Sequence, residues 1–546
     1  MAAGAGAGGG GRARARAVVV GGGVGGLAVG GRLARAGLDV AVLEKNPRAG
    51  GRAQGRAEAA PGLGDFRFDT GPSLLLMRRA YEEAFAALGS RELPFELLRV
   101  DPAYRVFFAD GSSLDLTSDV REMTRQLDRV EPGAGLAFVE WLAKAKAMFD
   151  IGGEFIETDA RTPMDLAKVD VAAALLSRVP PWELVLPHDS MLKLYFKDPR
   201  LRALLTFQDL YVGLSPYSAP GVFSLLAGTE IADGVWYPRG GFGAVRDGLR
   251  DAACANGADV RTGAHVRRVT VAGGRATGVE LENGEFVAAD VVVTNADVPY
   301  AYDDLLEGPR AAETARELSE KSFSAGVVSF NWSVKGRLTK ILHHSVFLSD
   351  DPKQAWDRAA SAGDLAEGGR CPRPNFYVHA PARSDPSCAP NGCDSIMVLL
   401  PVGNAQDVAG NGAAAADLDW APLVASGREA VLRRLEEAGV RVAPPGGGAE
   451  CSLREAIASE FVYTPKDWEH LYNVKYGAAF GLAHGLSQIS YFRPDNGPRG
   501  DEEPDGLYFV GASTRPGNGV PLVLTGAKIT SERILGDLGI TSGPVH

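Results

Sequence analysis

Glycines near residue 20 have the spacing of a loop that binds the phosphates of a dinucleotide. Gly21, Gly23 and Gly26 follow a short apolar run in a G-x-G-x-x-G pattern, and residues 39–43 predict a second strand that ends at Glu44. In such a unit the glycines permit a tight turn, close backbone approach to a pyrophosphate and close helix packing, in that order. The terminal acid accepts hydrogen bonds from the ribose hydroxyls. The spacing predicts a dinucleotide-binding β-α-β unit.

A second stretch near the C-terminus has the pattern of a cofactor-binding turn. Residues 506–510 predict an apolar strand, and a turn rich in Gly and Pro leads into a predicted helix over residues 522–535. Backbone N–H groups at such a turn and helix start can approach a bound cofactor. The candidate cofactor-binding residues here are Gly511, Gly519, Val520 and Pro521.

A flexible glycine loop is the simpler alternative in a chain with 68 glycines. Strand, helix and terminal acid in register favour the binding unit instead. Downstream, Gly51 and Arg52 resemble the flavoprotein pattern in which an arginine meets the pyrophosphate of FAD, with an exposed surface arginine as the alternative. No second glycine fingerprint follows a predicted strand, so we expect a tightly held flavin without a nicotinamide partner.

The composition excludes several classes of function. The net charge of -11 over 546 residues argues against nucleic-acid binding, which needs clustered Lys and Arg. The five cysteines form no C-x-x-C pair, so neither a disulfide framework nor a zinc site is expected. No apolar run reaches the ~18 residues of a membrane span. We predict no metal site, because the adjacent His343 and His344 lack a third ligand and are expected in an exposed loop or interface.

Four blocks of the chain resemble the bacterial and fungal phytoene desaturases, carotenoid desaturases within the flavin amine oxidase-like superfamily of FAD-dependent oxidoreductases. The superfamily shares the first block, and the second and fourth are more specific. The blocks span residues 18–73; residues 201–241, with Tyr-Val-Gly-Leu-Ser-Pro-Tyr and Gly-Val-Trp-Tyr-Pro-Arg-Gly-Gly; residues 289–299; and residues 464–521, with Gly-Leu-Ala-His and Tyr-Phe-Arg-Pro-Asp-Asn.

The resemblance implies an α/β fold with a Rossmann-like FAD-binding domain assembled from discontinuous segments and an interleaved α+β substrate domain. After a flexible or targeting tail at residues 1–16, we expect the FAD-binding domain in residues 17–94, 231–299 and 476–546. The substrate-binding domain then takes residues 95–230 and 300–475. Short strands with a hairpin turn at Asn283-Gly284 would return the chain to the FAD domain and carry Val266 past the adenine.

The implied reaction is FAD-dependent desaturation of a carotenoid precursor such as phytoene. A hydride leaves an allylic carbon for flavin N5 and the neighbouring carbon loses a proton, so positioning and water exclusion dominate catalysis. His484 and Arg515 are the candidate catalytic residues. For His484 a hydrogen-bonded core position is the alternative. Arg515 stands where the family commonly has His, and it would place a fixed positive charge near the reduced flavin.

Other side chains receive weaker assignments. Apolar residues 222–227 and several aromatic residues are candidates for the wall of a substrate tunnel, with core packing as the alternative. Glu230 and Asp233 are expected at a solvated helix end. The aromatic candidates are Phe207, Tyr211, Tyr217, Trp236 and Tyr237.

A polyene substrate implies peripheral membrane contact, with a plastid location if the source is a photosynthetic eukaryote, and a quinone or oxygen as electron acceptor. A redox-neutral carotenoid isomerase or a saturase of retinoid-like polyenes is the alternative enzyme. A non-catalytic flavin- or carotenoid-binding protein and an amine oxidase are the remaining alternatives.

Overall fold

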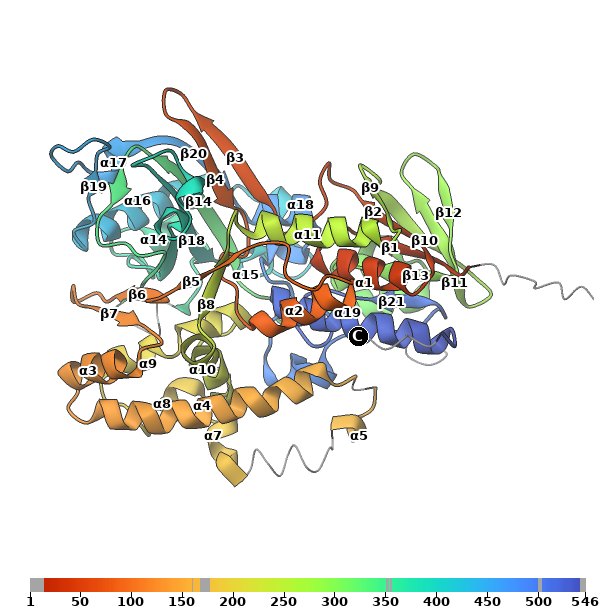
Figure 1. Ribbon diagram of the computed structural model, residues 1–546, viewed down its shortest axis with the longest axis horizontal. Coiled ribbons are helices and arrows are strands. Elements are labelled where there is room, and N and C mark those ends of the chain that lie inside the picture. The colour runs from red at the N-terminus through yellow and green to blue at the C-terminus, as the bar shows by residue number, and fades with distance from the viewer. Residues whose placement is uncertain are drawn as a thin grey trace, which may run out of the picture.

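The computed structural model describes residues 14–159, 161–166, 177–349, 353, 356–498 and 503–540. The predicted tail therefore lies outside the described residues up to residue 13. Figure 1 shows two lobes side by side, with a layer of helices along the lower edge of the left one.

A five-stranded parallel sheet forms the centre of the right-hand lobe (Figure 1). Its inner strands are apolar on both faces because helices cover one face and antiparallel strands within residues 266–288 cover the other. Val18 at its centre pairs with Ala41 on one side and Val292 on the other. The strand order is β21 (Leu507–Phe509), β13 (Val291–Thr294), β1 (Arg16–Val20), β2 (Asp39–Glu44) and β9 (Asp259–Thr262).

Three distant parts of the chain build this sheet, and helices from the same parts cover it. Helix α1 packs on both α11 and α19, and α19 also contacts α2. The covering helices are α1 (Val24–Arg35), α2 (Arg78–Ala87), α11 (Phe242–Ala255) and α19 (Val520–Asp537).

Antiparallel strands extend the same lobe. The predicted turn at Asn283-Gly284 lies between β11 and β12. These strands are β10 (Val266–Ala272), β11 (Arg275–Leu281) and β12 (Phe286–Ala288). A separate hairpin of β3 (Gly55–Ala60) and β4 (Gly64–Asp69) packs against the other lobe (Figure 1).

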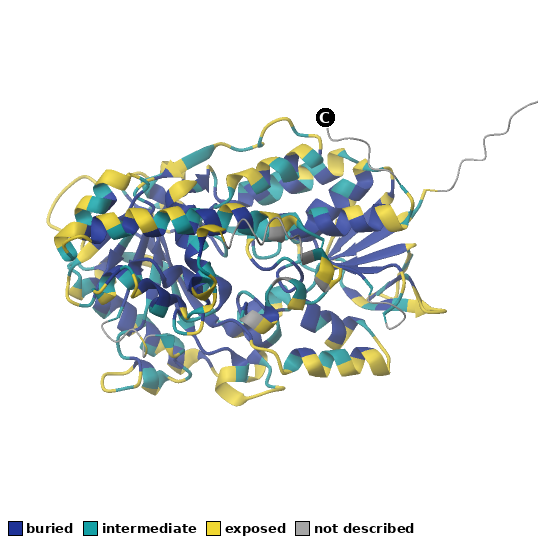
Figure 2. Ribbon diagram, turned by 90° about the horizontal axis from the view of Figure 1, so that it is seen from below, coloured by how far each residue is buried: buried dark blue, intermediate teal, exposed yellow. Residues whose placement is uncertain are grey.

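A seven-stranded mixed sheet forms the other lobe. All nine residues of its strand β14 are buried, and Figure 2 shows the strands as the buried interior beneath partly exposed helices. The order is β20 (Ile457–Tyr463), β14 (Gly326–Val334), β18 (Asp394–Val402), β17 (Phe376–His379), β16 (His344–Phe347), β6 (Tyr104–Phe107) and β7 (Ser113–Leu116).

Smaller elements surround this sheet. Two further strand pairs are β5 (Leu97–Val100) with β8 (Val235–Pro238) and β15 (Arg337–Leu338) with β19 (Val442–Ala443). The helices are α12 (Val298–Tyr300), α13 (Pro309–Ser319), α14 (Ala362–Leu365), α15 (Ala405–Ala409), α16 (Ala421–Glu437), α17 (Leu453–Ala456) and α18 (Pro465–Tyr472).

The layer of helices at the lower edge of Figure 1 closes the second lobe. Asp119 accepts hydrogen bonds from the first turn of α3, which fixes its start. The elements are α3 (Val120–Val130), α4 (Ala134–Glu157), α5 (Pro163–Leu166), α7 (Pro181–Val185), α8 (His188–Leu192), α9 (Pro199–Leu204), α10 (Ser224–Ala232) and the 3₁₀ turns η1 (Phe207–Val212) and η2 (Gly221–Phe223).

Within the described part of the chain, no helix combines the length and the apolar character that crossing a bilayer requires. All five cysteines are free thiols, as the absence of C-x-x-C pairs predicts.

Candidate functional site

A cavity of about 280 Å³ opens at the carboxyl ends of the parallel strands. This is the edge where open parallel sheets bind dinucleotides. Of the candidate cofactor-binding residues, nine line it: Gly21, Gly23, Glu44, Gly51, Arg52, Val266, Gly511, Gly519 and Val520.

The glycine loop brings the start of α1 to this cavity. No side chain caps α1, so N–H groups of its first turn remain available to a ligand. A Cβ on Gly23 would come 2.6 Å from Asn295 Oδ1, and one on Gly26 would come 2.1 Å from the Gly21 carbonyl oxygen. Gly26 does not line the cavity; it allows α1 to lie against the loop, which is the role that its spacing predicts.

Glu44 and Val266 mark one end of the cavity. Glu44 is buried, and its carboxylate accepts hydrogen bonds from the Gly22 amide at 2.9 Å and the Asn46 amide at 2.8 Å. These bonds fix the carboxylate at the end of β2, where it can also accept ribose hydroxyls. Val266 begins β10 on the same wall, so this end suits an adenosine.

Arg52 and Asp297 face the middle of the cavity with opposite charges. Arg52 donates to the Ala479 carbonyl at 2.9 Å, and one oxygen of Asp297 accepts from Ser513. Burial raises the pKa of Asp297, and the charge of Arg52 works against this. The other oxygen of Asp297, Oδ2, has no hydrogen-bond partner among the described residues. A buried acceptor of this kind fits a ligand that carries hydroxyl groups.

The C-terminal turn supplies the other end of the cavity. Gly519, with φ 96°, precedes α19, whose start also lacks a side-chain cap. Asn295 donates to the Val510 carbonyl at 2.9 Å and so ties β13 to β21 beside both glycine-rich turns. Asn295 and Asp297 belong to the block at residues 289–299, whose resemblance to the family points to no particular site residue.

A second cavity of about 560 Å³ adjoins the first. Phe480, Asn518, Gly519 and Val520 line both, so the two spaces meet at the C-terminal turn. The walls of the second cavity are mainly apolar and reach Phe149 of α4.

Some of the residues predicted for a substrate tunnel lie at the second cavity and others do not. Phe207, Tyr211, Leu225 and Leu226 line the second cavity. Pro521, predicted at the cofactor, lines this cavity instead. Tyr217, Trp236 and Tyr237 line neither cavity.

His484 occupies the core position that the sequence left as its alternative. It is buried, and its Nε2 accepts from the Asn518 amide at 3.2 Å. Burial lowers the pKa of His484 well below its ordinary value. The imidazole is therefore neutral and shapes the turn, because a Cβ on Gly517 would lie 2.5 Å from its Nε2.

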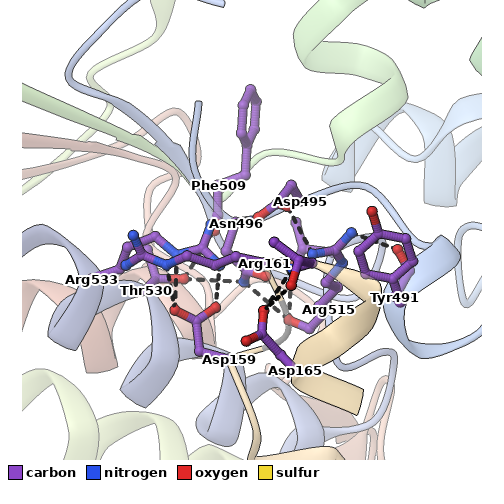
Figure 3. Close-up of polar contacts among 12 residues, drawn as sticks. Asp159, Arg161, Asp165, Tyr491, Asp495, Asn496, Phe509, Arg515, Thr530 and Arg533 are labelled. Carbon is purple, nitrogen blue, oxygen red and sulfur yellow. Dashed lines mark hydrogen bonds and ion pairs between the residues drawn. The ribbon is translucent and has the colours of Figure 1, made fainter. Parts of the chain in front are cut away.

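Arg515 is also a structural residue, which corrects the expectation of a fixed charge beside the flavin. Its guanidinium donates to Asp495 at 2.7 Å and lies 4.6 Å from the ring centre of Tyr491. Figure 3 shows the network continuing from Asp495 through Arg533 to Asp159. Arg515 lines neither cavity, so its charge is neutralised within the wall behind the turn.

Arg493 holds the turn in place from behind, and the sequence analysis gave it no role. Its fully buried guanidinium donates to the carbonyl groups of Ala512 at 2.7 Å, Ala483 at 3.0 Å and Thr514 at 3.1 Å. Burial lowers the pKa of Arg493 to about 9. Its signal was present in the Tyr-Phe-Arg-Pro-Asp-Asn block, although the block alone does not separate a structural arginine from a binding one.

Glu230 contradicts the prediction of a solvated helix end. It is only 1% exposed and accepts hydrogen bonds from Gln208 at 2.9 Å and from Tyr104 and Tyr211, each at 3.1 Å. Burial raises the pKa of Glu230 to about 7. Asp233, three residues later, is exposed as predicted.

The prediction of an exposed His343–His344 pair is wrong as well. Both rings are buried, and His379 on the neighbouring strand joins them. His343 Nε2 lies 3.1 Å from His379 Nε2, and His344 Nδ1 lies 2.6 Å from the Tyr377 hydroxyl. Burial lowers the pKa of His343 to about 3 and lowers the pKa values of His344 and His379 well below the ordinary value, so all three rings are neutral.

A parallel sheet with glycine turns at a cofactor-sized cavity, opening onto a large apolar cavity, defines a two-lobed dinucleotide-dependent oxidoreductase. Comparison with known proteins supports this class of oxidoreductase. Residues 24–377 match the family described as flavin containing amine oxidoreductase.

Sequence relatives narrow this class. The chain is 37% identical to a phytoene desaturase of Neurospora crassa, covering 95% of this chain and 84% of that one. It is 38% identical to a zeta-carotene-forming phytoene desaturase of Myxococcus xanthus, covering 95% and 93%. The chain therefore belongs to the phytoene desaturases within the flavin containing amine oxidoreductases.

Solved structures share the fold. An oxidoreductase of Methanosarcina mazei superposes with a TM-score of 0.58 at 18% identity, covering 95% of this chain and all of that one. A putrescine oxidase bound to putrescine gives 0.56 at 15% identity, covering 97% of this chain and all of that one. The predicted α/β fold is confirmed, and family membership makes the protein a flavin-dependent oxidoreductase.

Proposed function

We propose that this protein desaturates a C40 carotenoid precursor such as phytoene and that its flavin is FAD. The observation that carries the proposal is the apolar cavity of about 560 Å³ that meets the cofactor cavity at Asn518 and Gly519. A long polyene offers no polar handle, so apolar walls against the flavin are what its recognition requires.

FAD rather than a mononucleotide is supported by the two ends of the cofactor cavity. Glu44 and Val266 provide a site for an adenosine at one end, and the turn before α19 lies at the other. Between them, the uncapped start of α1 and Arg52 suit a pyrophosphate. When bound, the flavin supplies the site that accepts a hydride.

The protein residues hold and isolate the substrate. Leu225, Leu226 and Phe207 provide apolar contact along the cavity, and Asn518 fixes the segment of Tyr211 by donating to its carbonyl at 2.8 Å. Holding an allylic carbon in one orientation against the cofactor is worth several kcal/mol of the barrier, by analogy with oriented intramolecular reactions, where it reaches about 7–11 kcal/mol.

We further propose peripheral membrane contact through the lower helical layer. Large apolar side chains are exposed there: Leu136 and Val139 of α4, Met164 of α5, Trp182 and Val185 of α7, and Leu194. Helix α4 also carries Phe149 into the substrate cavity, so the helix spans from this surface to the cavity. An apolar surface of this kind suits a substrate that dissolves in lipid. A quinone or oxygen is the electron acceptor in this scheme.

Expression in phytoene-accumulating bacteria tests the function. Coloured products with more conjugated double bonds are expected. Products with an unchanged number of double bonds would support the isomerase alternative, and unchanged phytoene despite bound flavin would refute the proposal. A matched test of membrane contact replaces Trp182 and Val185 with Ser, which is expected to lower binding to phosphatidylcholine vesicles while flavin content stays constant.

A further inference from the structure

We propose that Glu230, acting through the hydroxyl of Tyr211, accepts the proton that the substrate loses during desaturation. This inference rests on the proposed function. It names a proton acceptor for a reaction in which neither His484 nor Arg515 can serve.

Tyr211 is the member of this relay that lies at the cavity proposed for the substrate. It lines the apolar cavity, and its backbone carbonyl is held by Asn518, which lines both cavities. The Tyr211 hydroxyl donates to Glu230 Oε1 at 3.1 Å. Glu230 lies behind the wall, so it acts on the substrate only through Tyr211 and is a positioning and proton-storing residue.

Three oxygen atoms form a closed triangle at this point. The hydroxyls of Tyr104 and Tyr211 lie 2.5 Å apart, and each lies 3.1 Å from Glu230 Oε1. A triangle with three hydrogen bonds needs three protons. The two tyrosines supply two, so an ionised Glu230 leaves the triangle one proton short, and a proton taken up there completes it.

The charges around Glu230 match this role. Gln208 donates to its second oxygen at 2.9 Å, and Tyr377 of β17 faces it without a charge. On α4, which packs against α10, Lys144 is paired with Glu183 and Lys146 with Asp150.

No cation among the described residues acts on Glu230, so burial dominates and raises the pKa of Glu230 to about 7. A base whose pKa lies near the working pH can both accept and release a proton.

Tyr377 and His344 form a second possible proton relay, but it is less suited to accept the substrate proton. Tyr377 also lines the cavity, and its hydroxyl lies 2.6 Å from His344 Nδ1 and 2.8 Å from Ser73 Oγ. Burial and the neighbouring histidines lower the pKa of His344 well below its ordinary value. Protonating His344 would put an unpaired positive charge in the core, whereas protonating Glu230 removes a negative one.

The step balances with a bound flavin as the oxidant. The flavin would take the hydride, with its electron pair, from the allylic carbon. The neighbouring C–H bond breaks, its electrons form the new carbon–carbon double bond, and its proton goes to the Tyr211 oxygen while the Tyr211 proton passes to Glu230. The proton later returns to solvent, and the electron acceptor reoxidises the flavin.

The test compares Glu230→Gln and Tyr211→Phe with Asp69→Asn in the flavin-loaded enzyme. Asp69 is a matched control, since it is a buried carboxylate with a raised pKa and a tyrosine partner but lines neither cavity. Wild-type turnover of phytoene in liposomes is expected to rise with pH through about 7. Glu230→Gln and Tyr211→Phe should both lose this pH dependence, and their kcat should fall by about 100-fold or more. Their flavin content and KM should change little.

A second readout does not depend on turnover. The infrared carbonyl band of a protonated carboxylic acid should disappear in wild type with a midpoint near pH 7 and be missing in Glu230→Gln. A Glu230→Gln enzyme with wild-type rate and pH dependence would overturn the proposal, as would loss of the dependence in Asp69→Asn. If wild type leaves phytoene unchanged, the proposed function fails instead, and the infrared titration still reports on Glu230.

Discussion

Replacing Gly26 with Ala tests how the glycine loop is held against α1. The new Cβ would lie 2.1 Å from the Gly21 carbonyl oxygen, about 0.9 Å inside the 3.0 Å that real Cβ atoms keep. The obstacle is backbone, so no side chain can rotate away. Either α1 or the loop must shift by nearly 1 Å. Overpacking of this kind costs about 1–3 kcal/mol, which exceeds the gain of about 1 kcal/mol in helix propensity.

The consequences extend to the cofactor because Gly21 lines its cavity. We expect Gly26→Ala to unfold at a lower temperature than wild type and to be purified with much less flavin, measured by visible absorbance per mole of protein. Gly536→Ala is the matched control, since this glycine also lies in a helix, α19, and a Cβ there meets nothing within 4 Å. A Gly26→Ala protein with wild-type flavin content and wild-type unfolding temperature would refute the packing argument.

Two further predictions concern buried polar groups. Burial raises the pKa of Asp69 from 3.8 to about 6, so the folded state holds its proton more tightly and stability is lost as pH rises from about 4 through 6. Asp69→Asn should remove this loss, worth about 3 kcal/mol, so denaturant unfolding at pH 5 and pH 8 should differ less in the variant; an unchanged difference would contradict the assignment. His188 lies 3.0 Å from Asp209 and 2.9 Å from Ser224 Oγ, like a hydrolytic triad, but Ser224 is fully buried and also accepts from Trp141. A fluorophosphonate probe should therefore leave Ser224 unlabelled, and labelling detected by mass spectrometry would show that the site opens.

The parts of the site that could be predicted from sequence are those built by neighbouring residues. The glycine loop and Glu44 lie within 24 residues of one another, and two of the glycines have a backbone reason to be there: Gly21 has a positive φ, and a Cβ on Gly26 would meet the Gly21 carbonyl oxygen. The same holds for the strand and turn before α19. In these places the local pattern determines the geometry, because strand, turn and helix follow one another without a long connection.

The parts that could not be predicted depend on contacts between distant segments. Glu230 meets Tyr104, Tyr211 and Gln208, which arrive from other elements, and nothing near residue 230 signals that an acid there is buried. A Glu in the last turns of a helix is usually solvated, so the sequence favoured the wrong environment. His379 lies beside His344 only because β16 and β17 pair in the register that places these two residues opposite each other.

Arg515 and Glu230 together explain how the reaction can proceed without a base at the C-terminal turn. At the turn, Arg515 is neutralised by Asp495, and His484 is neutral with its Nε2 already engaged by Asn518. Among the described residues that line the second cavity, no carboxylate or histidine is present, so hydroxyl groups are the proton-accepting groups that its own lining offers. Of these hydroxyls, that of Tyr211 is hydrogen-bonded to the stronger available base, Glu230. The arginine at position 515 is therefore compatible with turnover, because the proton acceptor, Glu230, lies behind the part of the wall that Tyr211 forms.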